Sequence, residues 1–166
     1  RPVFFKQARL GRTHQEFRIL KFCTMTNQRD VHGELLPDSE RTTSLGDFLR
    51  RTSFDEFPGF WNVVMGEMSI VGPRPLPPQY RERYSTEQDR RHEVKPGVTG
   101  WAQINGRNSI SWEDKFLLDV WYVKNQSLFL DVKIILLTVN YVLSRKGIVP
   151  DDKDAMEEFM GTKDRE

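Results

Sequence analysis

The stretch 111-SWEDKFLLDVWYVKNQSLFLDVKIILLTVNYVLSRKG-147 carries the strongest secondary-structure signal in this 166-residue chain. Residues 111–124 begin with a serine suited to cap a helix and then place apolar residues three and four positions apart, which predicts an amphipathic helix. Residues 127–145 predict a second helix that is apolar over most of its circumference. Basic residues and Gly147 follow at its end, as is common at helix C-termini. This second helix is either buried in the core or lies on a membrane surface, and periodicity alone leaves both open.

The rest of the chain adds short strands and shorter helices. Residues 2–7 and 16–22 are rich in Phe, Val and Ile, and the turn residues 11–14 between them predict a β-hairpin. Further along we expect a surface loop over 26–40, helices over 45–51, 53–65 and 79–91, turns over 69–78, and a glycine-rich loop over 95–108 with a short strand at 100–104. The expected fold is α+β and mostly helical, with a small N-terminal β-hairpin and amphipathic interfacial helices. One domain is expected over residues 1–149, followed by a charged tail over 150–166.

The composition excludes several classes of protein. A single cysteine, Cys23, rules out a disulfide framework and a four-cysteine zinc site. None of the three histidines is spaced as a metal-ligand pair, and neither a P-loop nor a G-x-G-x-x-G motif occurs. No run reaches the roughly 18–20 apolar residues that a membrane-spanning helix needs. Composition by itself therefore indicates a soluble, cytoplasmic-type domain.

The net charge of +1 conceals a basic N-terminal region. Residues 1–29 hold seven basic residues and one acidic residue, a net charge of +6. Such a region is either an ordinary solvated face or a surface for an anionic partner such as phosphate, nucleic acid or an anionic membrane. Nucleic acid is the least favoured partner, because stacking residues are few beyond Phe4, Phe5 and Phe17 and the whole chain is nearly neutral.

The segment 50-RRTSFDEFP-58 offers a carboxylate pair beside two arginines. Ser53 and Glu56 fit a helix capping box, which is the purely structural interpretation. The functional interpretation makes Asp55 a carboxylate nucleophile on phosphorus, with Glu56 holding a Mg²⁺ that screens the phosphate charge. Pro58 cannot donate the helical hydrogen bond, so the first turn is expected to be irregular or kinked.

Two further segments suit a phosphorylated ligand. In 72-GPRP-75 the prolines restrict the backbone around Arg74, whose guanidinium matches phosphate oxygens, although a rigid connection with a solvated arginine is equally compatible. In 97-GVTGWAQINGRN-108 the glycines permit close approach of a ligand, and Gln103 and Asn105 offer hydrogen bonds. There Trp101 either stacks on a base or sugar ring or fills the core.

Taken together, these segments resemble the bacterial sugar transferase family, the monotopic polyprenyl-phosphate phosphoglycosyl transferases that start capsule, exopolysaccharide and glycoprotein glycan assembly. The resemblance covers nearly the whole chain. It rests on ordered matches at FFKQ (4–7), KFCTM (21–25), RTSFDEFP (51–58), WNV (61–63), GEMSIVGPRP (66–75), PGVTGWAQINGRN (96–108) and DVWY (119–122).

The resemblance implies transfer of a sugar 1-phosphate from a UDP-sugar to polyprenyl (undecaprenyl) phosphate through a covalent phosphosugar–aspartate intermediate, with release of UMP. Asp55 would be the nucleophile and Glu56 its partner, and both would hold Mg²⁺. Phosphate and nucleotide-sugar contacts would come from Arg74, Arg107, Arg50, Lys21, Gln103 and Asn105. The implied partners are the donor, the lipid acceptor and the membrane surface at the cytoplasmic face of the bacterial inner membrane, with no nucleic acid. The alternative is a catalytically inactive module of the same fold that binds a nucleotide sugar or an anionic lipid.

Two departures from the family pattern stand out. Members usually carry Arg or Lys where this chain has Cys23, which removes a positive charge near a phosphate or membrane contact. Members also begin with a hydrophobic re-entrant helix just upstream of the position that matches Arg1, which leads us to expect such a segment before this sequence.

Overall fold

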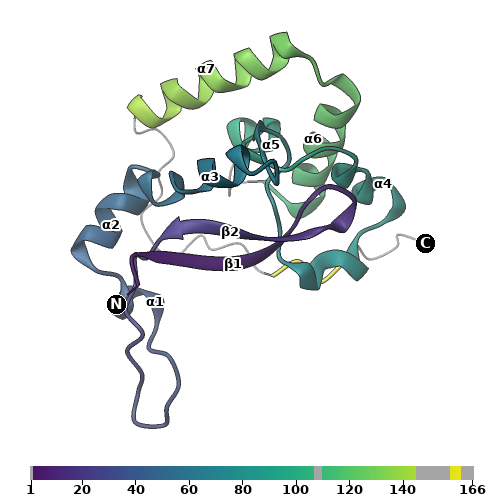
Figure 1. Ribbon diagram of the computed structural model, residues 1–166. Helices are drawn as coiled ribbons and strands as arrows, with labels where there is room; N and C mark the ends of the chain where they lie inside the picture. Colours follow the sequence, from purple (N-terminus) through teal and green to yellow (C-terminus); the bar gives the residue numbers. More distant parts are fainter. Residues whose placement is uncertain (1, 107–109, 145–157, 162–166) are drawn as a thin grey trace.

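The chain opens with the β-hairpin that the sequence predicts. The computed structural model describes residues 2–106, 110–144 and 158–161 (Figure 1). Strand β1 (Phe4–Leu10) pairs antiparallel with β2 (Glu16–Phe22), and the short 3-10 helix η1 (Arg12–His14) joins them. Phe17 and Ile19, which alternate with exposed residues on β2, are buried against Met68. Strand β2 therefore has one face in the core and one in solvent, whereas β1 is exposed over most of its length.

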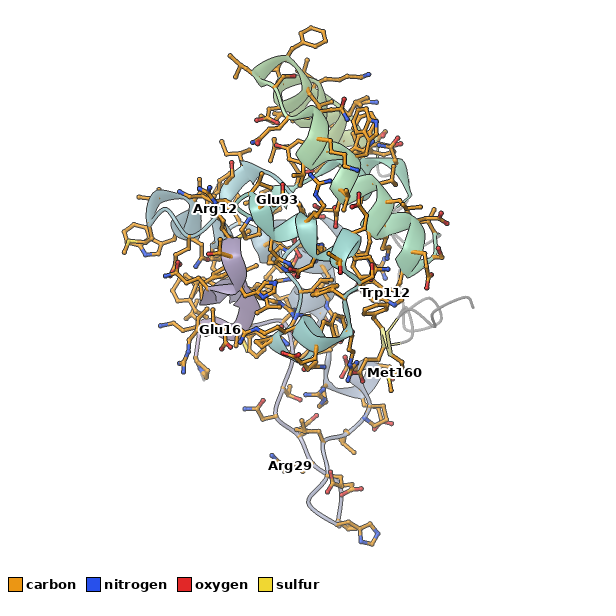
Figure 2. All side chains as sticks on the ribbon, turned by 90° about the vertical axis from the view of Figure 1, so that its right-hand side faces the viewer. Arg12, Glu16, Arg29, Glu93, Trp112 and Met160 are labelled. Carbon is orange, nitrogen blue, oxygen red and sulfur yellow. The ribbon has the colours of Figure 1, made fainter. Side chains whose placement is uncertain are left out.

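A run of short helices and a second small sheet follow the hairpin. Strands β3 (Ser69–Val71) and β4 (Gly97–Thr99) pair in parallel. Between β2 and the first helix a long loop projects from the body, and Figure 2 labels Arg29 on it. The short helices are α1 (Asp38–Arg41), α2 (Ser44–Arg51), η2 (Phe54–Glu56), α3 (Gly59–Val64), η3 (Pro78–Arg83), α4 (Thr86–Asp89), η4 (Arg90–Glu93) and α5 (Trp101–Asn105).

The two long helices confirm the pattern of residues 111–144, and the basic residues and Gly147 expected at the end of the second helix lie outside the described residues. Helix α6 (Trp112–Asn125) is capped by Ser111, whose side chain accepts a hydrogen bond from the Asp114 amide, and α7 (Leu128–Ser144) follows. The main core lies where α5, α6 and α7 meet the second sheet, and it comprises Val71, Ile104, Tyr122, Leu130 and Ile134. The opposite side of α7 exposes Leu128, Phe129, Leu136 and Leu143. This helix therefore has both a core face and an exposed apolar face.

Several local predictions were wrong in detail. The loop expected over 26–40 ends in helix α1, and the turns expected over 69–78 begin with strand β3. Residues 100–104 do not form a strand, because β4 ends at Thr99 and Gly100 begins helix α5. The helix expected over 53–65 is broken into η2 and α3, which meet at Pro58 as the missing N–H of proline requires. The helix expected over 79–91 is divided into three pieces, because Ser85 starts a new one with a capping box to Gln88.

Aromatic side chains hold the last described segment. Phe159, in the stretch described from its sequence as a charged tail, is only 2% exposed and packs with Tyr80 and Phe116. The Arg83 guanidinium lies 2.8 Å from the Glu158 carboxylate and also donates to the Phe159 carbonyl. Residues 158–161 are thus packed against η3 and α6. Trp101 likewise packs against the main core and stacks on Trp121, which supports its core interpretation.

Candidate active site

Strand β2 presents a lysine toward the Asp55-Glu56 turn. Because side chains alternate along a strand, Lys21 shares a face with Phe17 and Ile19, which are buried. Helix α3 lies against β2, and Asn62, only 3% exposed, connects the two: its amide nitrogen donates to the Arg18 carbonyl and its oxygen accepts from the Leu20 amide. These bonds set the position of the turn relative to the strand.

The second sheet brings Arg74 to the same place. The Gly72 amide donates to the Thr99 carbonyl and the Gly97 amide donates to the Pro73 carbonyl, so 72–75 runs closely beside β4. A Cβ on Gly97 would stand 2.1 Å from the Gly72 nitrogen, which excludes any larger residue there. A hydrogen bond from the Arg91 guanidinium to the Arg74 carbonyl, at 2.7 Å, also fixes the position of this segment.

Glu56 is the acceptor on which two cations converge. Its Oε1 lies 2.7 Å from Lys21 Nζ and 2.6 Å from an Arg74 guanidinium nitrogen. Its Oε2 lies 3.4 Å from the other Arg74 nitrogen. Burial would raise the pKa of Glu56, but Arg74 and Lys21 outweigh it and hold that pKa far below its ordinary value. Glu56 therefore stays ionised at any physiological pH.

Glu56, Lys21 and Arg74 form an ion-paired cluster. Asp55 lies beside this cluster, and its environment differs from that of Glu56. Among the residues that the structure describes, its carboxylate makes no hydrogen bond or ion pair. Burial and the neighbouring Glu56 charge raise the pKa of Asp55, while Lys21, Arg50 and Arg74 act in the opposite direction. A half-buried carboxylate with open lone pairs next to cations is suited to attack an electrophilic phosphorus.

We expect Glu56→Gln to destabilise the protein most at neutral pH. As pH falls below the ordinary value of 4.5, the unfolded chain takes up a proton that the folded chain, with its lowered pKa, does not. The contribution of Glu56 to stability is thus present above that value and is lost on acidification. Urea unfolding of both proteins between about pH 7 and pH 3 measures this.

The exposed Glu34→Gln is the control for that comparison, because Glu34 lies in the loop between β2 and α1 and is not among the residues that line the cleft. A stability difference for Glu56→Gln that does not change with pH would contradict the assigned ion pairs.

A shallow cleft opens in front of the ion-paired cluster. It measures about 350 Å³ including its solvent-open part, and Lys21, Glu56, Arg74 and Arg9 are among its lining residues. Three cations against one carboxylate leave an excess of positive charge, which suits an anionic ligand. Sequence reasoning missed Arg9. The signal was available in the hairpin register, since Arg9 lies opposite Phe17 and therefore on the face of Lys21.

The other described residues that were expected at the site do not line the cleft. Gln103 donates to the Val98 carbonyl from α5, and the exposed Asn105 donates to the Trp101 carbonyl of its own helix. Arg50 is exposed at the end of α2 and reaches Asp55 only through its charge. Arg107 lies outside the described residues.

The capping-box interpretation of Ser53 and Glu56 was wrong. Ser53 has a left-handed backbone with φ of 58°, and its side chain makes no cap hydrogen bond. The glutamate side chain turns to Lys21 and Arg74 instead, and the α-helix begins only at Gly59. The cations of the cleft, rather than a helix N-terminus, therefore supply its positive potential.

A family model and a similar known protein both carry the description of a sugar transferase. A family model described as "Bacterial sugar transferase" matches residues 1–145. The chain is 55% identical to the uncharacterized sugar transferase EpsL of Bacillus subtilis (strain 168), a match covering 98% of this chain and 81% of that protein.

Two relatives named for a reaction are more distant. The chain is 42% identical to the UDP-galactose-lipid carrier transferase of Erwinia amylovora and 42% identical to the UDP-glucose:undecaprenyl-phosphate glucose-1-phosphate transferase of Xanthomonas campestris pv. campestris. These matches cover 88% and 87% of this chain but 34% and 32% of the relatives, so the chain spans about a third of their length.

Proposed function

This chain belongs to the bacterial sugar transferase family, and we propose that it transfers a sugar 1-phosphate from a UDP-sugar to polyprenyl phosphate. The observation that carries the proposal is the placement of the Asp55 carboxylate. It is free of hydrogen bonds among the described residues, and it interacts through its charge with Glu56, Lys21 and Arg74, which line a cleft with excess positive charge. The names of two relatives support a UDP-sugar donor, and one of them supports undecaprenyl phosphate as acceptor.

The proposed chemistry is a double displacement on one phosphorus atom. A carboxylate oxygen of Asp55 attacks the phosphorus that bears the sugar, the bond from that phosphorus to the bridging oxygen breaks, and UMP leaves with the electron pair. An oxygen of the polyprenyl phosphate then attacks the phosphorus of the adduct and the Asp55 carboxylate departs. Such transfer depends mainly on positioning and on stabilisation of phosphate charge, which Arg74 and Lys21 are placed to supply.

Glu56 has a supporting part in this proposal. Its ionised carboxylate orients Arg74 and Lys21 at hydrogen-bond distance and keeps both cations at the mouth of the cleft. Its negative charge also raises the pKa of Asp55, after the larger effect of burial. A more basic carboxylate is a stronger nucleophile, provided that it remains ionised at working pH.

The carboxylate pair fits a magnesium ion. Mg²⁺ commonly takes one or two protein carboxylates and completes its shell with water and substrate phosphates. The open Asp55 carboxylate and Glu56 Oε2, which lies 3.4 Å from Arg74, match that donor set. In this proposal Asp55 and Glu56 hold the ion, which when bound supplies positive charge against the donor's diphosphate.

Apolar side chains near the cleft suit a lipid surface. Phe54 of η2, Phe57 just after it and Trp61 of α3 are exposed by 51%, 59% and 61%, and α2 ends at Arg51 just before them in the chain. Aromatic residues beside basic ones favour an interface with anionic lipid. We place this face at the cytoplasmic surface of the bacterial inner membrane, where the acceptor's phosphate would reach the cleft.

Within the described part of the chain, no helix combines the length and apolar character needed to cross a bilayer.

Incubation with a UDP-sugar and Mg²⁺ in the absence of lipid tests the proposed function. We expect a burst of about one UMP per active site and an intact mass increased by one sugar phosphate. Addition of polyprenyl phosphate should then remove the adduct. A screen of UDP-glucose, UDP-galactose and their N-acetyl derivatives identifies the donor. Binding of a UDP-sugar with neither UMP nor adduct would refute the transferase and leave an inactive binding module.

A further inference from the structure

Arg9 lies within the cleft but differs from its other cations. It comes from β1, is half-buried, and lines the cleft together with Lys21 and Arg74. Arg74 is close enough that its charge acts against the charge on Arg9. The hairpin register accounts for this placement, because the partner of Arg9 is the buried Phe17.

The charge on Arg9 is not matched by a carboxylate. Lys21 and Arg74 both pair with Glu56, whereas Arg9 makes no ion pair among the residues that the structure describes. Its guanidinium donates at 2.6 Å to Gln7, whose amide is neutral. Burial, followed by the Arg74 charge, lowers the pKa of Arg9, so the site itself disfavours this cation. Charges withdrawn from solvent are normally paired or bound to a ligand, whereas Arg9 is favoured only by charge interactions with Glu56 and then Tyr80, without a contact to either carboxylate or phenol oxygen among the described residues.

We propose that Arg9 is a further phosphate-binding residue of the cleft. The positive charge of Arg9 is balanced only when a phosphate group occupies the cleft. The inference rests on the proposed function and extends it to a residue outside the motif that contains Arg74. Of the five N–H groups of a guanidinium, the bond to Gln7 uses one, and the planar fork matches two oxygens of a phosphate. Arg9 and Arg74 together would grip the ligand from β1 and from the 72–75 segment.

The phosphate can come from the diphosphate of the donor or from the lipid acceptor. Binding of UDP reports the first source and binding of farnesyl phosphate the second, and neither measurement needs turnover. We expect Arg9→Met to weaken UDP binding by about tenfold to a hundredfold, since it removes a charge-assisted hydrogen bond at similar side-chain volume. Arg9→Lys should retain an intermediate affinity, because it keeps the charge and loses the fork.

Arg18→Met is the matched control. Arg18 lies on the same hairpin opposite Ala8, is exposed, and faces away from the cleft. It should leave the affinity for both ligands unchanged. Thermal unfolding without ligand provides a second readout: Arg9→Met should keep or raise the melting temperature, because it removes a half-buried cation that has no ion-pair partner among the described residues.

Two outcomes would overturn the inference, and two others would decide the source of the phosphate or the transferase proposal. An Arg9→Met protein that is clearly destabilised or fails to fold would show a structural role. One that binds UDP and farnesyl phosphate as the parent protein does would show that no phosphate contacts Arg9. Weakened farnesyl phosphate binding alone would assign the residue to the acceptor. If the parent protein binds UDP but forms no adduct, the transferase proposal fails while the assignment of Arg9 is still decided by the affinities.

Discussion

Asp55→Asn is expected to abolish the UMP burst and the covalent adduct, with a loss of at least roughly a thousandfold in rate. The amide has nearly the same shape as the carboxylate but offers no anionic oxygen to attack phosphorus. Binding of UDP should persist, because Lys21, Arg74 and Glu56 are unchanged. Single-turnover UMP release and intact-mass measurement on the same sample separate the loss of chemistry from a loss of binding.

The free energy of unfolding provides a second test of Asp55→Asn. Burial and the Glu56 charge raise the pKa of Asp55, which means that the folded protein disfavours the ionised form. Removal of that charge should therefore leave the free energy of unfolding unchanged or increase it, as is common when a strained functional group is replaced.

Asp47→Asn is the matched control for Asp55→Asn. Asp47 lies on the neighbouring α2, is 45% exposed at its side chain, and pairs with Arg51 at 2.9 Å in solvent. The same chemical change there should leave the burst intact. A normal burst from Asp55→Asn would exclude Asp55 as the nucleophile.

Arg91→Gln is expected to have the largest effect on stability. The Arg91 and Asp119 side chains are 2% and 5% exposed and lie 2.8 Å apart. Loss of one partner from a buried pair leaves the other charge without compensation and costs about 3–5 kcal/mol. Burial already raises the pKa of Asp119 against the effect of Arg91, so removal of Arg91 should raise that pKa further. Urea unfolding measures the change in free energy.

The same variant should also slow catalysis. The Arg91 guanidinium donates to the Arg74 carbonyl at 2.7 Å, so it is a positioning residue for the arginine that faces the cleft. A displacement of about 1 Å at a reacting centre can cost about a hundredfold in rate, and we expect a decrease of that order in UMP release. Because UDP binding depends less on exact placement, kcat should fall more than the affinity.

A double-mutant cycle tests the pairing. The Arg91→Gln/Asp119→Asn protein should lose less stability than the sum of the two single variants, because neither buried charge is then left alone. Arg90→Gln is the neighbouring control, since Arg90 forms only exposed pairs with Glu87 and Glu93. Additive losses in the double variant would contradict the assigned pair.

The predictions from the sequence held best where a pattern is local and repeated. The hairpin strands, the Ser111-capped helix and the helix of residues 127–145 follow from alternation, capping and apolar periodicity, and all three are present. They failed where tertiary contacts outweigh local preference. The strand expected at 100–104 is a helix, because the extended segment beside Gly72 ends at Thr99.

In the candidate site, too, some residues could be identified from local motifs and others only from the tertiary structure. Motifs identified Asp55, Glu56 and Arg74, and the resemblance to a known family indicated the chemistry that they would perform. The sequence also made Ser53 and Glu56 look like a capping box, because a local motif cannot reveal distant cations. Only the fold brings Lys21, from β2, and Arg74, from the segment that follows β3, to Glu56.

By itself the sequence determined the class of fold and the residues able to attack or bind phosphate. The tertiary structure decided which of them meet, which one is left with an open carboxylate, and that Arg9 belongs with them. The physical reason is that periodicity and capping depend on neighbours a few positions away. Charge balance, burial and hydrogen-bond partners depend instead on residues such as Lys21 and Arg74, which are far from Glu56 along the chain and adjacent to it only after folding.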